Sequence, residues 1–217
     1  LRIRHDREQV LLHRLLSDAH VRPRAQAALL RYDTRFVHAP AHHAALSALQ
    51  DRHAALAPTV RLVRRWFGAQ LLLGHVGPET LDLLCAAVFL TNAHAVPATG
   101  MHGFVRVLTL LAHWDWREVP LLLPLENATR LAHQRKAALS DGGVSALPSE
   151  RAPTFPAAQR ADAEQHFRAM RARDPAYRHY TWVVATEHDT DAKAWMHAAP
   201  SAMVADGVRQ LARRAAL

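Results

Sequence analysis

The apolar residues of this chain recur mostly at helical spacing, and the pattern is strongest in the segment 103–125. There, a stripe of apolar side chains runs along one face of a helix from Phe104 to Leu111. Trp114 and Trp116 follow where this helix should end, and each indole brings an N–H group that needs an acceptor. We therefore expect this segment to organise the core, and we interpret its aromatic residues as packing residues rather than ligand contacts.

The same periodicity predicts further helices before and after this segment. They are expected over residues 7–16, 41–56, 60–73, 81–90, 126–139, 157–173 and 202–215. The first should be capped by Asp6 and should bury Val10, Leu11, Leu15 and Leu16. The helix over 81–90 is apolar nearly all round, which predicts a central position in the fold.

Three segments carry patterns that favour other structures. Residues 29–39 include bulky aromatic and β-branched side chains and are expected to be extended or irregular. Two prolines bracket Leu121–Leu123, which fits a short extended segment, and Tyr180–Thr186 (YTWVVAT) is typical of a strand. Residues 141–156 are rich in Ser, Gly and Pro, so they form either a linker or an ordered surface loop.

These elements predict a mainly α fold with a small α/β unit at the C-terminus. The expected divisions are residues 1–30 as a lead-in helix or the end of a preceding domain, 31–140 as a helical domain, 141–156 as the linker and 157–217 as the α/β domain. The chain begins at Leu1 in the middle of a pattern, so we interpret it as part of a longer protein.

Charge adds a candidate partner to this picture. The 217 residues carry a net charge of +8, and nearly all of the positive charge is arginine, because Lys136 and Lys193 are the only lysines. Arginine binds phosphate through a bidentate fork, which favours an RNA partner, whereas a GC-rich genome would produce the same bias without any function. Arg61, Arg64 and Arg65 gather on one side of the predicted helix 60–73 and form either a solvated face or a phosphate-contacting face.

The residues that could carry chemistry do not form a recognisable catalytic or metal-binding pattern. The single Cys85 lies among apolar residues, where a thiol is inert, and the 16 histidines are scattered. Asp189-Thr190-Asp191 follows a predicted strand but lacks hydrophobic flanks and a preceding Gly-Ser loop, so we interpret it as a solvated turn. Asp115 is expected to cap a helix or to pair with Arg117 or Arg106. We therefore predict no catalytic residues, no metal and no cofactor, and the apolar runs are too short to cross a membrane.

Three segments together resemble the C-terminal region of the Nrap family of nucleolar RNA-associated proteins. They are TVRLVRRWFGAQLL, PETLDLLCAAVFL and GFVRVLTLLAHWDWREVPLLL. Near the end of the chain, the strand at Val183–Thr186, Asp189, Trp195 and the Pro200-Ser201 helix start are also similar to the last domain of the family, as are Arg171, Arg173, Asp174 and Pro175. The resemblance extends from about Arg31 onward, and residues 1–16 resemble the end of the preceding family domain.

The resemblance implies a helical domain like the one that follows the nucleotidyltransferase core in poly(A) polymerases and oligoadenylate synthetases (PAP/OAS1-like). It implies a non-catalytic scaffold of the small-subunit processome in the nucleus and nucleolus, acting in pre-18S rRNA processing. The implied partners are pre-rRNA, the snoRNA-containing pre-ribosome and other processome proteins, such as a Utp-C-type subcomplex. The predicted RNA contacts are Arg61, Arg64, Arg65 and Arg117.

Two other functions are compatible with the same residues. The chain could be the helical portion of an active nucleotidyltransferase whose metal-binding acids lie upstream of Leu1. It could also be a simple RNA-binding module that uses its arginine-rich face.

Overall fold

The computed structural model describes residues 5–90, 96–126, 128–131, 134, 153–196 and 199–216. The chain divides into two compact units, Leu1–Ala44 and Ala45–Leu217, which are described separately. Most of the predicted linker 141–156 and most of the predicted helix 126–139 lie outside the described residues. Among the described helices, none combines the length and the apolar character that crossing a lipid bilayer requires.

The first unit contains α1 (Asp6–Leu15), α2 (Arg22–Asp33) and the π-helix η1 (Thr34–His38). From α2 onward the helices are continuous: η1 passes directly into α3 (Ala39–Arg52), which begins in the first unit and ends in the second. The prediction that residues 29–39 are extended or irregular is therefore wrong. Pro40 has no N–H to give to a helical acceptor, and the wider π turn, in which Ala39 N–H donates to Thr34 O, carries the helix past it.

The apolar face of α1 is exposed in the described part of this unit. Val10, Leu11 and Leu15 are 52%, 56% and 46% exposed, so the prediction that α1 buries them is wrong. The pattern identified an apolar face but not a partner for it. The predicted cap is wrong as well, because His5, not Asp6, is the N-cap residue and accepts a hydrogen bond from Arg7 N–H.

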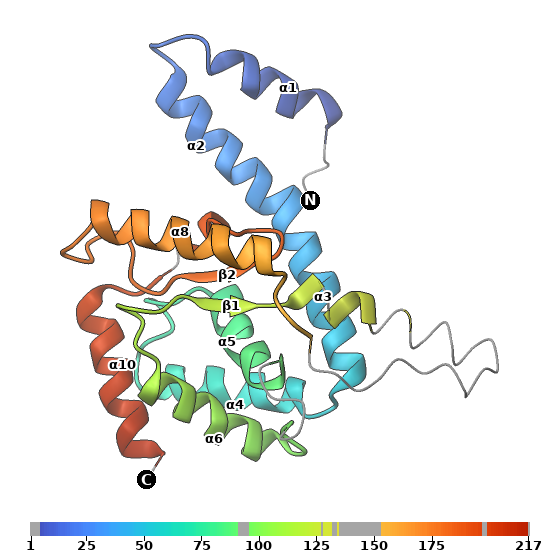
Figure 1. Cartoon of the computed structure of the whole chain (residues 1–217), viewed down its shortest axis with the longest axis vertical. Coiled ribbons are helices and arrows are strands. Elements are labelled where there is room, and N and C mark those ends of the chain that lie inside the picture. The colour runs from blue at the N-terminus through green and yellow to red at the C-terminus, as the bar shows by residue number, and fades with distance from the viewer. Residues whose placement is uncertain are drawn as a thin grey trace. The chain divides into compact units, whose positions relative to one another are not determined.

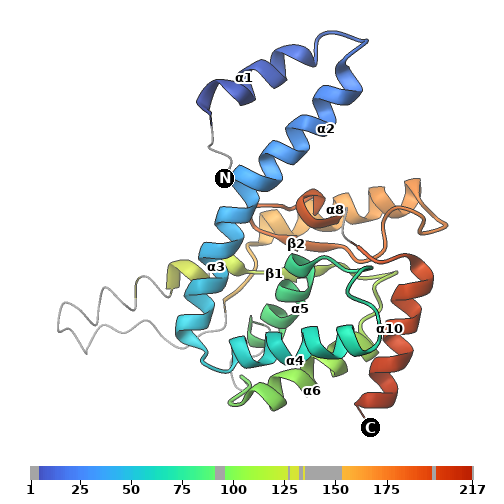
Figure 2. The ribbon, with the colours of Figure 1, turned by 180° about the vertical axis from the view of Figure 1, so that it is seen from behind.

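The second unit contains the large hydrophobic core and a small parallel sheet (Figures 1 and 2). Its elements are α4 (Leu56–Ala69), α5 (Pro78–Leu90), α6 (Gly100–His113), β1 (Leu121–Leu123), α8 (Ala157–Arg173), β2 (Val184–Thr186), α9 (Lys193–Met196) and α10 (Ala202–Ala215). The predicted bounds of α8 and α10 are confirmed. The fold is mainly helical with a small sheet, as the sequence indicated.

The sheet joins two segments that are far apart in the sequence. Strands β1 and β2 run parallel, with Leu121 opposite Val184 and Leu123 opposite Thr186. Helix α8 covers one face of this sheet: Phe167 of α8 packs in a cluster with Ala185 of β2, and Leu122 of β1 packs against that cluster. In both views α5, α4 and α6 lie on the other side of the sheet (Figures 1 and 2). The strand predicted over 180–186 is shorter in the structure and begins at Val184.

Helix α5 is the centre of this core, as its uniform apolar pattern predicted. From Leu83 to Leu90 every residue is buried, and Cys85 is fully enclosed. Burial raises the pKa of the Cys85 thiol far above its usual range, so the thiol stays protonated and unreactive.

Helices α4 and α6 approach closely because α6 carries glycines at the contact. A Cβ atom at Gly103 would lie 2.0 Å from Oγ1 of Thr59, and one at Gly100 would lie 2.5 Å from Cβ of Pro58. The fully buried Thr59 hydroxyl donates to Ala55 O at 2.8 Å. The glycines therefore set the distance between the two helices.

The end of α4 differs from the prediction. The predicted helix extends to residue 73, but α4 ends at Ala69 and Leu71 is 85% exposed. Leu71 has a φ of 59°, and the N–H groups of Leu71 and Leu72 donate to the carbonyls of Gly68 and Phe67. This is a Schellman motif with leucine at the position that usually holds glycine.

Candidate RNA-binding surface

The three predicted arginines of α4 lie on its exposed face, opposite the buried Val63 and Phe67. Arg64 reaches across to α5, where its Nη2 donates to the two carboxylate oxygens of Asp82 at 2.7 and 2.9 Å. Burial raises the pKa of Asp82, and the Arg64 guanidinium partly offsets this. Among the described residues, Arg61 and Arg65 make no comparable side-chain pair, so they give this face its uncompensated positive charge.

The fourth predicted contact, Arg117, serves as a bridge between two segments of the chain. Its Nη2 donates to Asp206 of α10 at 2.6 Å, and its guanidinium lies 4.3 Å from the ring centre of Trp116. The hydrogen bond that Arg117 donates to the Asp206 carboxylate raises the pKa of Arg117. The prediction that Asp115 pairs with Arg117 or Arg106 is wrong, because Arg209 Nη1 is the cation that lies 3.8 Å from Asp115.

The two tryptophans that follow α6 are packing residues, as expected from the sequence. Trp114 and Trp116 are both buried, and Trp114 Nε1 donates to Val119 O at 2.8 Å. The ring of Trp114 lies 6.0 Å from that of Trp182, which comes from the segment before β2. The buried Nε1 groups of Trp116 and Trp182 have no acceptor among the described residues.

Arg171 of α8 holds the segment after α6 against the segment before β2. Its guanidinium donates to the carbonyls of Trp116, Arg117 and Thr181 at 2.5, 3.0 and 2.8 Å, and also to the carbonyl of Tyr180. It also lies 4.6 Å from the ring centre of Phe167. Burial lowers the pKa of Arg171, yet an arginine remains charged at physiological pH.

Asp174 orders the loop that carries Tyr180 and Thr181, whose carbonyls are two of the acceptors of Arg171. Its carboxylate accepts backbone N–H groups from Arg178 at 2.9 Å, His179 at 2.7 Å and Tyr180 at 3.0 Å. These hydrogen bonds, that of His179 first, lower the pKa of Asp174. Sequence reasoning noted Arg171 and Asp174 only within the family pattern and missed their role, because the acceptors are backbone groups that no side-chain pattern records.

The Asp189-Thr190-Asp191 segment is a turn, but the prediction that it is solvated is wrong for Asp189. That carboxylate is 5% exposed and accepts the N–H groups of Lys193 and Ala194, both at 2.9 Å, at the start of α9. Asp191 pairs with the Lys193 ammonium, which lowers its pKa against the effect of burial. The carboxylates of Asp189 and Asp191 therefore both bind neighbouring groups of the same turn and of α9. No group of three or more potential metal ligands occurs among the residues that the structure describes.

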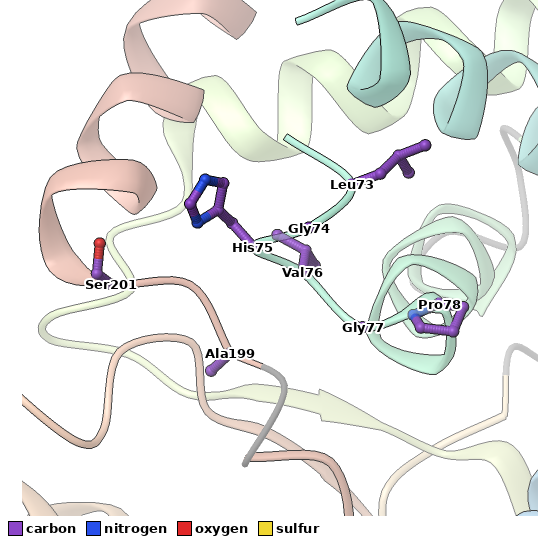
Figure 3. A pocket seen from close by; sticks show the side chains of 8 residues that line it. All are labelled: Leu73, Gly74, His75, Val76, Gly77, Pro78, Ala199 and Ser201. Atoms are coloured by element: carbon purple, nitrogen blue, oxygen red, sulfur yellow. The ribbon is translucent and has the colours of Figure 1, made fainter. Parts of the chain in front are cut away.

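One shallow pocket of about 380 Å³ opens between the α4–α5 connection and the start of α10 (Figure 3). It is lined by Leu73, Gly74, His75, Val76, Gly77, Pro78, Ala199 and Ser201. Ser201 is the N-cap of α10, where its Oγ accepts from Val204 N–H at 3.4 Å. His75 is exposed beside it, and no acid or second histidine joins them in the lining, so the pocket brings together no nucleophile and base.

Two family models match consecutive parts of the chain. Residues 53–217 match the Nrap protein PAP/OAS1-like domain 5, and residues 1–51 match the Nrap protein nucleotidyltransferase domain 4. The boundary between these matches falls at the end of α3.

The names of several curated relatives refer to the nucleolus or to a small nucleolar RNA. The chain is 29% identical over 213 residues to U3 small nucleolar RNA-associated protein 22 of Schizosaccharomyces pombe, covering 98% of this chain and 17% of that protein. It is 25% identical over 194 residues to the Saccharomyces cerevisiae protein of the same name, covering 87% of this chain and 16% of that protein. It is 34% identical over 136 residues to human Nucleolar protein 6, covering 62% of this chain and 12% of that protein. The chain thus spans less than a fifth of the length of these relatives.

Proposed function

Because the chain belongs to the Nrap family, we propose that it acts as a non-catalytic scaffold of the small-subunit processome in ribosome biogenesis. In this role it binds pre-rRNA, the snoRNA-containing pre-ribosome and assembly factors of a Utp-C-type subcomplex, in the nucleolus. The observation that carries the proposal is the match of residues 53–217 to the PAP/OAS1-like domain of the family. The names of two relatives, which describe proteins associated with a small nucleolar RNA, support the RNA partner.

The way the charged residues of the second unit are used supports a scaffold. Asp174 and Asp189 bind backbone N–H groups, and Arg171 binds backbone carbonyls. Arg64 and Arg117 pair with carboxylates on other helices. These groups fix the positions of segments relative to one another, which is the requirement for a rigid binding surface rather than for proton or phosphoryl transfer.

The exposed face of α4 is the proposed RNA contact. Arg61 and Arg65 are one helical turn apart, so both guanidinium groups reach the same side of the helix. We assign them the main phosphate contacts. Arg64 and Arg117 have to share their charge with Asp82 and Asp206, so their contribution to RNA affinity is smaller.

The test is RNA binding measured by fluorescence anisotropy over a series of salt concentrations, with a labelled RNA stem-loop as the probe. We expect Arg61→Ala/Arg65→Ala to weaken binding and to reduce the salt slope by roughly two. The matched control is Arg160→Ala/Arg168→Ala, which removes two exposed arginines from α8. An equal effect of both double variants would show that only net charge matters, and absence of binding by the unsubstituted chain would contradict the RNA-binding part of the proposal.

One finding favours a second function, which is nucleotidyl transfer. Residues 1–51 match a domain that the family names a nucleotidyltransferase. The discriminating assay incubates the longer protein that contains this sequence with Mg²⁺, an RNA primer and nucleoside triphosphates. The scaffold proposal predicts no primer extension above that of a heat-denatured control. Metal-dependent extension that is lost when upstream paired acids are replaced by asparagine would establish catalysis instead.

A further inference from the structure

Two arginines of α10 converge on a single backbone oxygen at the end of α6. Nε of Arg209 lies 3.4 Å and Nε of Arg213 lies 3.1 Å from the carbonyl oxygen of Ala112. Both views show α10 running beside the C-terminal end of α6 (Figures 1 and 2). The two guanidinium groups are therefore held side by side, one helical turn apart on the same face of α10.

Part of this arrangement is helix capping. The last carbonyls of an α-helix lack intrahelical partners and carry the negative end of the helix dipole, so a cation is favourable there. One arginine is enough to satisfy Ala112 O, however. A second guanidinium at the same oxygen adds repulsion between like charges that capping does not require.

The surrounding charge does not compensate for the second guanidinium. Asp115 is near only one of the two, with its Oδ1 3.8 Å from Arg209 Nη1, and Asp206 is already bound to Arg117. The Nη groups of Arg213 have no hydrogen bond or ion pair with the described residues, and the residue is exposed. Arg214, which follows it, is exposed too and adds a further positive charge. Arg213 therefore has free, oriented donors, and the surface around it has a surplus of positive charge, while Arg209 is paired with Asp115 through a single long contact.

The geometry points to a binding site for phosphate groups of an RNA backbone, formed by Arg209 and Arg213. Anchoring each Nε to Ala112 O fixes the guanidinium planes before binding, so less side-chain freedom is lost when a ligand arrives. The remaining Nη donors suit a phosphodiester, whose two charged oxygens accept hydrogen bonds from two guanidinium groups at once.

This site rests on the proposed function, since it needs RNA as the partner, but it uses a different surface from that of Arg61 and Arg65. The experiment measures anisotropy of the labelled RNA stem-loop with the full chain and with Arg209→Ala/Arg213→Ala. We expect an affinity loss of roughly ten-fold or more and a salt slope smaller by about one to two. The control Arg160→Ala/Arg168→Ala should change the affinity by about two-fold or less.

A second variant separates phosphate binding from helix capping. Arg209→Lys/Arg213→Lys keeps both charges but has no Nε donor for Ala112 O. Its thermal unfolding midpoint should fall about as far as that of the alanine variant, whereas most of its salt slope should remain. If RNA affinity instead follows the unfolding midpoint across both variants, the pair only caps α6 and the proposal is overturned.

The remaining outcomes also decide the question. If the unsubstituted chain binds RNA and Arg209→Ala/Arg213→Ala binds it with the same affinity and slope, this site is disproved while the proposed function stands. If the unsubstituted chain does not bind RNA, both fail. If polyglutamate displaces RNA from the unsubstituted chain and binds Arg209→Ala/Arg213→Ala more weakly, but RNA affinity does not depend on the pair, an acidic protein is the partner.

Discussion

At the scale of single residues, Gly103 has no room for a side chain. Its Cα faces Thr59, and the space for a Cβ atom is already filled by the Thr59 side chain at 2.0–3.0 Å. Thr59 is held by its own hydrogen bond to Ala55 O and cannot withdraw into a packed core. The separation of α4 and α6 therefore depends on the absence of one methyl group.

We predict that Gly103→Ala lowers the free energy of unfolding by about 3 kcal/mol or more, because the added methyl group forces the two helices apart. Urea denaturation followed by circular dichroism measures this. The matched control is Gly207→Ala on α10, where a Cβ atom meets nothing within 4 Å. That change should raise stability by roughly 0.5–1 kcal/mol. Similar effects of the two substitutions would contradict the packing account.

His53 provides a pH test of burial. Desolvation and the nearby Arg52 charge lower the pKa of His53 to about 4, from 6.5. Between these values the unfolded chain binds the proton and the folded chain does not, so this residue destabilises the fold as the pH falls from about 6.5 towards 4. Above about pH 7 the effect is absent in both states.

We predict that His53→Gln reduces the loss of stability between neutral pH and pH 4, relative to the unsubstituted chain. The measurement is urea denaturation at several pH values. His102→Gln, which replaces an exposed histidine, should leave the pH dependence unchanged. A pH dependence that is the same with and without His53 would show that the imidazole is not desolvated.

At the scale of elements, the sequence predicts correctly those helices whose apolar residues pack into the continuous core. The uniform apolar run of α5 and the amphipathic patterns of α8 and α10 were enough to predict their helices. A prediction failed where the folded backbone overrode a residue's local preference. Residues 29–39 are helical despite their bulky aromatic and β-branched side chains, and Leu71 occupies a left-handed position that favours glycine.

The junction between α8, β2 and the segment after α6 depends on Arg171. We predict that Arg171→Met lowers the free energy of unfolding by about 3 kcal/mol, because the carbonyls of Trp116, Arg117, Tyr180 and Thr181 lose a common donor. Arg168→Met, at a side chain 76% exposed on the same helix, should change it by less than about 0.5 kcal/mol. Chemical denaturation of both variants measures the difference, and equal stability would contradict the role given to Arg171.

At the scale of the whole molecule, the mainly helical fold, a strand near residues 180–186 and the family could be predicted from the sequence, but the pairing of that strand with Leu121–Leu123 and the use of the charges could not. Patterns of side chains reveal apolar faces, whereas the acceptors of Arg171, Arg209 and Arg213 are backbone carbonyls of segments that come close only in the folded chain. For the same reason the helix face that carries Arg61, Arg64 and Arg65 did not show which of these arginines is paired. The structure separates Arg61 and Arg65, which are unpaired among the described residues, from Arg64, which is paired with Asp82.

The central claim is that this chain is a rigid scaffold that meets RNA through arginine-bearing helix surfaces. The most direct test is ultraviolet crosslinking, followed by mass spectrometry, of this protein within purified pre-ribosomes. We predict RNA crosslinks on peptides that contain Arg61 and Arg65 of α4 and on peptides that contain Arg209 and Arg213 of α10. RNA crosslinks that spare both helices and fall elsewhere on this chain would contradict the account.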